Sequence, residues 1–188
     1  MKSKIPAVIF AGGKSSRMGR DKALLPFGGE KTLTEYQAKR LSELFDEVYI
    51  SWKSDKIENL NYPKIYDLEQ YSDISAPTVG LLSILQKFNG YVFIISVDSP
   101  FFEKSEIERL LETLSGDAVI PQNSNGIEPL IGVYHSSLAE KVKTMIESEN
   151  HRLRWLLKNV DTNFIDFSED RPFKNLNYFE EYKEALKG

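Results

Sequence analysis

Short apolar runs alternate along the chain with segments in which apolar residues recur at helical spacing. A short continuous apolar run is typical of a β-strand, and a recurrence close to each helical turn is typical of an amphipathic helix. The run at 91–98 is almost wholly apolar, which favours a strand covered on both faces, as in a parallel sheet. We expect strands at 4–10, 47–53, 64–67, 91–98, 117–121, 127–135 and 163–167.

Capping residues mark where several helices are expected to begin. Thr32 with Glu35, and Ser105 with Glu108, match the capping-box pattern, in which two side chains satisfy backbone N–H groups of the first turn. These pairs place helices between successive predicted strands. We expect helices at 32–45, 78–88 and 106–114, a further helix opened by Ser137 and Glu140, and late helices at about 150–159 and 178–187.

Strands that alternate with helices predict an α/β fold. Right-handed crossovers between such strands give a doubly wound, mostly parallel sheet with helices on both faces. The 188 residues lie near the usual size of one domain, and no linker rich in Pro, Gly or Ser interrupts them. We therefore expect a single domain over 1–188.

Composition and charge narrow the class of protein. Hydrophobic residues make up 41% of the chain and charged residues 28%, as in ordinary globular proteins. The net charge is −4, from 24 Lys and Arg against 28 Asp and Glu, which argues against a general nucleic-acid-binding protein. The absence of cysteine excludes thiolate metal sites and a cysteine nucleophile.

The chain is expected to be cytoplasmic and to bind no membrane. No apolar run approaches the ~20 residues that a membrane-spanning helix needs. The first predicted strand begins so close to Met1 that no room is left for a signal peptide.

The loop after the first predicted strand combines glycines with cations. Ala11, Gly12 and Gly13 follow the strand, and Arg17 and Lys22 lie further along the loop. Glycines let backbone N–H groups approach an anion, and the two cations can neutralise phosphate oxygens. In open α/β sheets ligands bind beyond the carboxyl ends of the strands, where this loop lies.

Two carboxylates are expected at the same edge of the sheet. Asp67 ends the predicted strand 64–67 and Asp98 ends the strand 91–98. A triphosphate with Mg²⁺ needs oxygen ligands beside positive charge, which these carboxylates and the glycine loop together offer. The pattern therefore predicts a nucleoside triphosphate site.

The glycine loop matches neither of two common phosphate-binding motifs. The pattern G-x-x-x-x-G-K-[ST] fails because five residues separate Gly13 from Gly19. The dinucleotide pattern G-x-G-x-x-G fails because Gly12 and Gly13 are adjacent. A Walker loop and a dinucleotide-binding fold are therefore disfavoured.

The stretch FAGGKSSRMGRDKALL at 10–25 closely resembles the opening of the molybdenum cofactor guanylyltransferases. These are MobA-like members of the nucleotidyltransferase superfamily, with a Rossmann-like fold and the pattern L-A-G-G-x-S-x-R-M-G-x-D-K-x-L-L. Further motifs follow in the family's order, so the resemblance covers nearly the whole chain. They are IYD at 65–67, VGLLSIL at 79–85, SVDSP at 96–100, EPLIGVY at 128–134 and FKNLNYFEEY at 173–182.

The resemblance implies an enzyme that transfers GMP from GTP to the phosphate of molybdopterin. Pyrophosphate is released, Mg²⁺ is required, and other proteins of molybdenum cofactor biosynthesis are further candidate partners. By position, Phe10, Ala11, Gly12 and Gly13 would line the nucleotide with Ser51 and Asp67, Lys22 would contact phosphates, and Asp98 would bind nucleotide and Mg²⁺. Asn175 and Asn177 match late asparagines of the family and would face the pterin. We add Arg17 as a phosphate clamp, so that Lys22, Arg17 and Asp98 form the expected catalytic set.

The chain departs from the family pattern at three places. Phe10 replaces a leucine, Ser51 stands where a nucleotide-contacting asparagine is usual, and the segment 76–80 reads APTVG in place of G-P-L-x-G. These positions leave open a related nucleotidyltransferase that uses CTP or a sugar-phosphate acceptor. A non-catalytic GTP-binding assembly factor is the second alternative.

The basic stretch HRLRWLLK at 151–158 has two interpretations. It can form an amphipathic helix with a solvated basic face, or its arginines can meet an anionic substrate. His135 and His151 lie far apart in the sequence, without the spacing of metal ligands, and are expected to be structural or surface residues.

Overall fold

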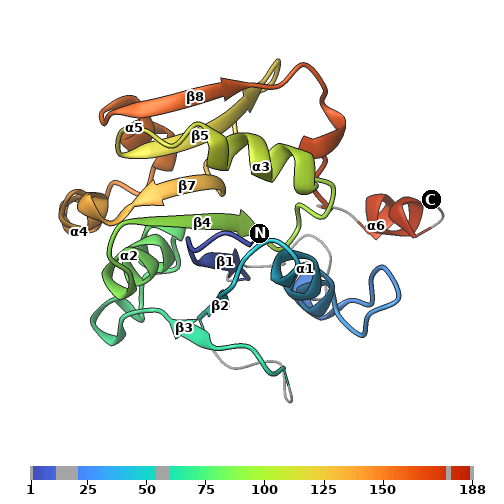
Figure 1. Cartoon of the computed structure of the whole chain (residues 1–188). Helices are drawn as coiled ribbons and strands as arrows, with labels where there is room; N and C mark the ends of the chain where they lie inside the picture. The colour runs from blue at the N-terminus through green and yellow to red at the C-terminus, as the bar shows by residue number, and fades with distance from the viewer. Residues whose placement is uncertain (1, 12–20, 54–59, 177–178, 187–188) are drawn as a thin grey trace.

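One mixed sheet forms the centre of the molecule (Figure 1). The computed structural model describes residues 2–11, 21–53, 60–176 and 179–186. The strands are β1 (Ala7–Phe10), β2 (Val48–Trp52), β3 (Lys64–Tyr66), β4 (Tyr91–Ser96), β5 (Ala118–Asn123), β6 (Gly126–Ile127), β7 (Ile131–His135) and β8 (Thr162–Asp166). The helices are α1 (Leu33–Ser42), α2 (Pro77–Lys87), α3 (Lys104–Glu112), α4 (Ala139–Glu147), α5 (Leu153–Lys158) and α6 (Phe179–Ala185).

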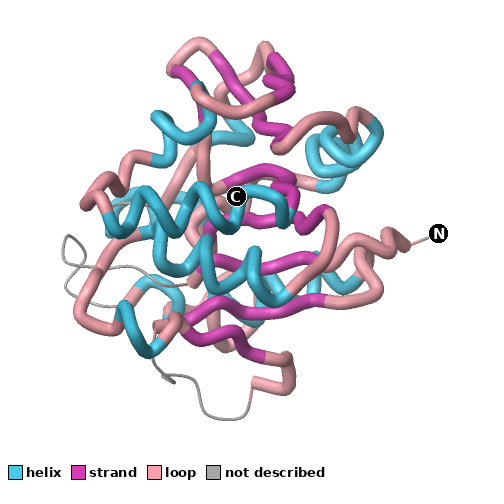
Figure 2. Tube along the Cα trace, turned by 90° about the vertical axis from the view of Figure 1, so that its left-hand side faces the viewer, coloured by secondary structure: helices cyan, strands magenta, loops and turns pink. Residues whose placement is uncertain are grey.

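The strands follow the order β3-β2-β1-β4-β7-β5-β6, and β8 pairs with β5. Figure 2 shows them stacked from one end of the molecule to the other. Strands β3, β2, β1 and β4 run parallel, and β8 runs parallel to β5. The predicted α/β fold with a mostly parallel sheet is thus confirmed, and no described helix is long and apolar enough to cross a membrane.

Strand β7 runs antiparallel between β4 and β5, which the sequence pattern did not indicate. The predicted strand 127–135 divides into the short β6, which pairs with the end of β5, and β7. Only residues 124–130 separate β5 from β7, and such a short connection permits antiparallel pairing, whereas parallel pairing needs a long crossover. Residues 128–130 connect β6 to β7.

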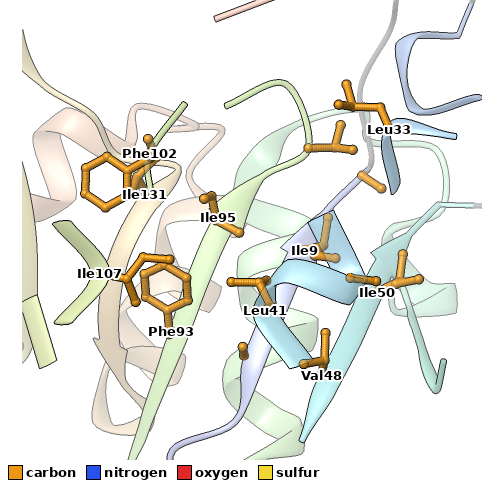
Figure 3. Close-up of a cluster of buried hydrophobic side chains, with 14 of the residues drawn as sticks. Ile9, Leu33, Leu41, Val48, Ile50, Phe93, Ile95, Phe102, Ile107 and Ile131 are labelled. Atoms are coloured by element: carbon orange, nitrogen blue, oxygen red, sulfur yellow. The ribbon is translucent and has the colours of Figure 1, made fainter. Parts of the chain in front are cut away.

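Side chains of β1 alternate between two hydrophobic cores. Ala7 and Ile9 belong to the core that α1 and α3 cover, and Val8 and Phe10 belong to the core that α2, α4 and α5 cover. Figure 3 shows Leu41 of α1 close to Ile9 in the first core. Because β1 is buried on both faces, its carboxyl end has a fixed position in the sheet.

Two of the predicted helix starts are wrong. The cap of α1 agrees with prediction, since the Glu35 N–H donates to the Thr32 hydroxyl at 3.0 Å. Helix α3 is instead capped by Glu103, whose N–H donates to the Glu106 carboxylate at 3.1 Å, two residues earlier than the predicted cap at Ser105. Helix α4 begins only at Ala139, after a 3₁₀ turn at 136–138, because the hydroxyl of Ser137 donates to Asp117.

Candidate active site

Parallel strands bring several predicted site residues to one edge of the sheet. Phe10, at the end of β1, pairs in register with Ser51 of β2 and Ser96 of β4. Ala11 continues beyond β1, where its N–H donates to the carbonyl of Ser51 at 3.0 Å. Asp67 follows β3 directly, and Asp98 follows β4 after one residue. This edge is where open α/β sheets bind ligands.

An ion pair between Lys22 and Asp98 lies at the centre of this edge. The Lys22 Nζ is 2.6 Å from the Asp98 Oδ2, and each side chain is only 17% exposed. Lys22 opens a 3₁₀ turn at 22–24 whose first N–H groups are capped by Asp21, and Thr34 of α1 donates to the carbonyl of Ala23 at 2.9 Å. Residues 76 positions apart are thus brought together, as the nucleotide hypothesis requires.

The second carboxylate oxygen of Asp98 is held by its own strand. The hydroxyl of Ser96 donates to the Asp98 Oδ1 at 2.5 Å. The backbone is fixed as well, since the Leu176 N–H donates to the Asp98 carbonyl at 2.9 Å. The carboxylate is therefore oriented on both sides, toward Lys22 and toward Ser96.

The donor set around Asp98 fits a divalent cation that shares its ligands with a substrate. Among the described residues no group of three or more His, Cys, Asp or Glu side chains could hold a metal ion. Mg²⁺ is commonly bound by one or two carboxylates together with substrate phosphates and water. The ammonium of Lys22 on the carboxylate marks this position as attractive for positive charge.

Asp67 faces the first turn of α2. A Cβ added at Gly80 would lie 2.6 Å from the ring of Phe10 and 3.5 Å from the Asp67 Oδ1, so only glycine fits there. Burial raises the pKa of Asp67, and the positive charge of Lys53 acts in the opposite direction. Phe10 and Asp67 are thus brought together against the one helix whose APTVG start departs from the family pattern.

The remaining predicted site residues lie in different surroundings, and four of them fall outside the described residues. Ser51 lies within β2, where it is buried. Asn175 accepts a hydrogen bond from the hydroxyl of Ser99 at 2.7 Å, so it borders the segment after Asp98. Arg17, Gly12, Gly13 and Asn177 lie outside the described residues.

The C-terminal segment contacts the chain close to both members of the ion pair. Leu176 bonds the backbone of Asp98, and the hydroxyl of Tyr182 in α6 donates to the carbonyl of Pro26 at 2.5 Å. Pro26 follows the turn that carries Lys22. Contacts from 176 to 182 therefore reach both the Asp98 segment and the Lys22 turn.

Beside this edge lies a cleft of about 420 Å³, which sequence reasoning missed. Its lining is mostly apolar with a basic rim: Pro77, Pro129, Leu130, His151, Arg152, Leu153, Arg154 and Trp155. Trp155 is 43% exposed although it is a large apolar side chain. The sequence signal for this cleft is the basic stretch 151–158, which contributes His151, Arg152 and Arg154 to the lining.

Two contacts tie the cleft to the end of β4 and to α2. The Ser96 N–H donates to the carbonyl of Leu130 at 2.8 Å, next to Asp98. Thr78 of α2 and the Nδ1 of His151 are 2.7 Å apart. Thus His151 has a structural partner in α2, and the cleft lies next to the end of β4.

Glu128, directly before Pro129 and Leu130 of the cleft, carries a partly buried carboxylate. Burial raises the pKa of Glu128, the charge of Asp98 raises it further, and Arg154 acts in the opposite direction. The Arg154 guanidinium is 3.9 Å from the Glu128 carboxylate. Gln37 and Arg40 of α1, which sequence reasoning also missed, donate hydrogen bonds to backbone carbonyls on either side of Asp98.

Comparison with known proteins gives one family match and close relatives. The family model described as MobA-like NTP transferase domain matches residues 7–163. A molybdenum cofactor guanylyltransferase from Campylobacter jejuni subsp. jejuni serotype O:6 is 37% identical over 184 residues, covering 96% of this chain and 95% of the relative. One from Helicobacter pylori strain G27 is 34% identical over 188 residues, covering 97% and 92%.

Solved structures share the fold. A crystal structure of a putative protein from Aquifex aeolicus VF5 is 30% identical, with a TM-score of 0.78 over 94% of this chain and 95% of that one. The molybdopterin-guanine dinucleotide biosynthesis protein A from Archaeoglobus fulgidus is 22% identical, with a TM-score of 0.81 over 97% of each chain. At 22% identity this second likeness shows the fold alone.

Asp67→Asn should stabilise the protein at neutral pH. The folded-state pKa of Asp67 is raised above its ordinary value of 3.8, so the folded state loses stability as the pH rises through that shifted pKa. An asparagine cannot ionise and escapes this loss. We expect a higher melting temperature than wild type near about pH 7.5, with the difference shrinking as the pH falls toward about 4.

The exposed Asp73 lies in the same segment between β3 and α2 and provides the control. Asp73→Asn should leave the melting temperature unchanged at both pH values. A lower melting temperature for Asp67→Asn at neutral pH would show that the carboxylate stabilises the fold, contrary to this prediction.

Proposed function

The chain belongs to the family of MobA-like NTP transferase domains, and from this premise we propose that it transfers GMP from GTP to the phosphate of molybdopterin. The products are pyrophosphate and the guanine dinucleotide form of the cofactor. The observation that carries the proposal is the contact between Lys22 and Asp98 beyond the ends of β1 and β4, where a nucleotide is expected in this fold. The reaction is proposed for the cytoplasm, where GTP is available.

The chemistry requires alignment more than proton transfer. A phosphate oxygen of the acceptor attacks the α-phosphorus of GTP, and the bond from that phosphorus to the bridging oxygen breaks, so that pyrophosphate leaves with the electron pair. Because the acceptor phosphate is already an anion, no side-chain base is needed. Positioning of the two anions and neutralisation of their charge supply most of the catalysis.

Lys22 and Asp98 are proposed to serve the reacting phosphates. Asp98 would hold Mg²⁺ together with the triphosphate, and the ion would supply neutralising charge to the reacting phosphates. The Lys22 ammonium, held at this point by the turn 22–24, is proposed to contact the phosphates. Arg17 is proposed as a second phosphate contact.

The remaining nucleotide contacts are proposed along the same edge. The backbone from Phe10 to Gly13 would approach the nucleotide, and Asp67 would bind its guanosine part. The position of Asp67 against Gly80, at the start of α2, supports this role. Ser51, which is buried in β2, is proposed as a further contact of the nucleotide.

The cleft beside Trp155 is proposed to receive the acceptor. Its apolar lining suits a flat heteroaromatic ring, and Arg152 and Arg154 at its rim suit an anionic phosphate. The bond from Ser96 to Leu130 places the cleft next to Asp98, so that the acceptor phosphate can approach the α-phosphate. Asn175, which accepts a hydrogen bond from Ser99, and Asn177 are also proposed to contact the pterin.

A panel of nucleotides tests the proposed function directly. The protein is incubated with Mg²⁺, molybdopterin and each of the four nucleoside triphosphates, and released pyrophosphate is measured. GTP alone should give pyrophosphate. Turnover of CTP would make the chain a cytidylyltransferase, and GTP binding without pyrophosphate release would make it a binding protein.

Asp98→Asn should abolish turnover in a protein that stays folded. The variant keeps the side-chain volume but removes the charge, and loss of one preorganised charge commonly lowers kcat on the order of 100-fold or more. The measurement is kcat for pyrophosphate release, with a circular dichroism melt to confirm folding. The surface pair of Lys4 and Asp46, also 2.6 Å apart, offers a matched control, and Asp46→Asn should retain wild-type kcat. Near-normal activity of Asp98→Asn would refute the assignment.

Trp155→Leu should weaken acceptor binding without affecting GTP. Aromatic stacking contributes about 1 kcal/mol, so the KM for molybdopterin should rise roughly fivefold or more while the KM for GTP stays unchanged. Trp155→Phe, which keeps a flat ring, should lie close to wild type. Of the two tryptophans, Trp52 is only 3% exposed, so quenching of tryptophan fluorescence by molybdopterin should report Trp155. Equal quenching in Trp155→Leu would place the acceptor elsewhere.

A further inference from the structure

Two polar side chains of helix α1 pack against the segment that carries Asp98. Gln37 and Arg40 lie one turn apart on the side of α1 that faces the sheet, among core residues such as Leu41. Gln37 is fully buried, and burial lowers the pKa of the Arg40 guanidinium. Burying an amide and a guanidinium costs free energy unless their hydrogen bonds are satisfied. Their partners therefore indicate what these side chains do.

Arg40 bonds the backbone on the far side of Asp98. Its NH1 donates to the carbonyl of Pro100 at 3.0 Å and to the carbonyl of Phe102 at 2.8 Å. Its NH2 donates to the Oε1 of Gln37 at 2.5 Å. The Nε of Arg40 is buried and has no hydrogen-bond partner among the described residues. The guanidinium therefore makes its hydrogen bonds there through NH1 and NH2, to these three acceptors.

Gln37 bonds the backbone on the near side of Asp98. Its Nε2 lies 3.4 Å from the carbonyl of Ser96 and 3.4 Å from the carbonyl of Val97. Because Arg40 holds the Oε1, the amide of Gln37 is oriented with its NH₂ group toward these two carbonyls. The two side chains thus act as one unit.

Together the pair satisfies four carbonyls that bracket Asp98. Two precede it and two follow it, and a buried carbonyl left without a donor costs about 1–3 kcal/mol. The segment from β4 to α3 cannot shift without losing several of these bonds. An apolar pair at positions 37 and 40 would fill the same space but would remove these four side-chain contacts, and the Ser96 carbonyl would keep only the N–H of Ser99 at 3.2 Å.

We propose that Gln37 and Arg40 are positioning residues that hold the backbone around Asp98 so that its carboxylate meets Mg²⁺ and the triphosphate in the required orientation. This inference rests on the proposed function, since it concerns the metal-binding role of Asp98. Neither side chain touches the substrate. Both act through the carbonyls of the segment 96–102.

The pair has a specific consequence for the metal. Asp98 is the carboxylate proposed to hold Mg²⁺, so the affinity for a divalent cation depends on where this one side chain points. A displaced Asp98 weakens the metal and slows the chemistry. The metal-free affinity for GTP, which depends on the Lys22 turn and the end of β1, is unaffected.

Two variants remove the donors in different ways. Gln37→Glu keeps the volume and the acceptor for Arg40, but it replaces the donor toward the carbonyls of Ser96 and Val97 with an oxygen. Arg40→Met removes the donors to Pro100 and Phe102. Controls are Gln86→Glu on the exposed face of α2 and Lys39→Met, which removes a surface cation beside Arg40 on the same helix.

The test measures metal binding separately from turnover. Binding of Mn²⁺ is followed by electron paramagnetic resonance in the presence of GTP and without acceptor, and binding of GTP is measured without metal. Both variants should lose Mn²⁺ affinity about tenfold and kcat about tenfold, with metal-free GTP binding unchanged, as for a change worth one or two hydrogen bonds. Arg40→Lys, which keeps a donor, should recover part of the Mn²⁺ affinity.

Wild-type Mn²⁺ affinity in Gln37→Glu, whatever its melting temperature, would overturn the inference, because a purely structural role moves stability alone. Gln37→Glu also carries the test if Arg40→Met does not fold. Failure of the proposed function is distinguishable: a wild-type protein without pyrophosphate release, whose Mn²⁺ affinity in the presence of GTP still falls in Gln37→Glu, would retain the positioning role. A wild-type protein that binds no Mn²⁺ in the presence of GTP would overturn both.

Discussion

The site depends on one half-buried carboxylate that is held from every side. Asp98 is bonded by Lys22 and Ser96 through its side chain and by Leu176 through its backbone. Such a contact at 2.6 Å between partly desolvated charges is stronger than an exposed ion pair. It identifies the carboxylate of Asp98 as a position that favours a positive charge. The Lys22 turn, the ends of the parallel strands and the C-terminal segment all converge on this carboxylate.

The antiparallel strand β7 determines what lies next to that carboxylate. By entering the sheet between β4 and β5, it brings residues 128–130 to the end of β4. A wholly parallel sheet would place a crossover helix there instead. The departure from the parallel pattern thus creates one wall of the cleft, while α5 with Trp155 forms the other.

Sequence patterns predicted the fold and the residues at the strand ends, because apolar periodicity and strand alternation are local properties of the chain. They failed where partners are distant in sequence. The antiparallel pairing of β7 follows from strand contacts, and α3 is capped by Glu103 together with Glu106, while the hydroxyl of Ser105 donates to the Glu106 carboxylate. From the sequence alone, Gln37 cannot be told from the other inward-facing positions of its helix, because the carbonyls that it bonds lie about sixty residues away.

The contact between Tyr182 and Pro26 joins residues 156 positions apart in the sequence. Contacts of such long range form late, since the chain between them must first be ordered. A chain still emerging from the ribosome lacks this bond and the bond from Leu176 to Asp98, although its strands β1 to β4 are already made. The surroundings of the ion pair between Lys22 and Asp98 are therefore completed only when the segment that carries Leu176 and Tyr182 has folded against them.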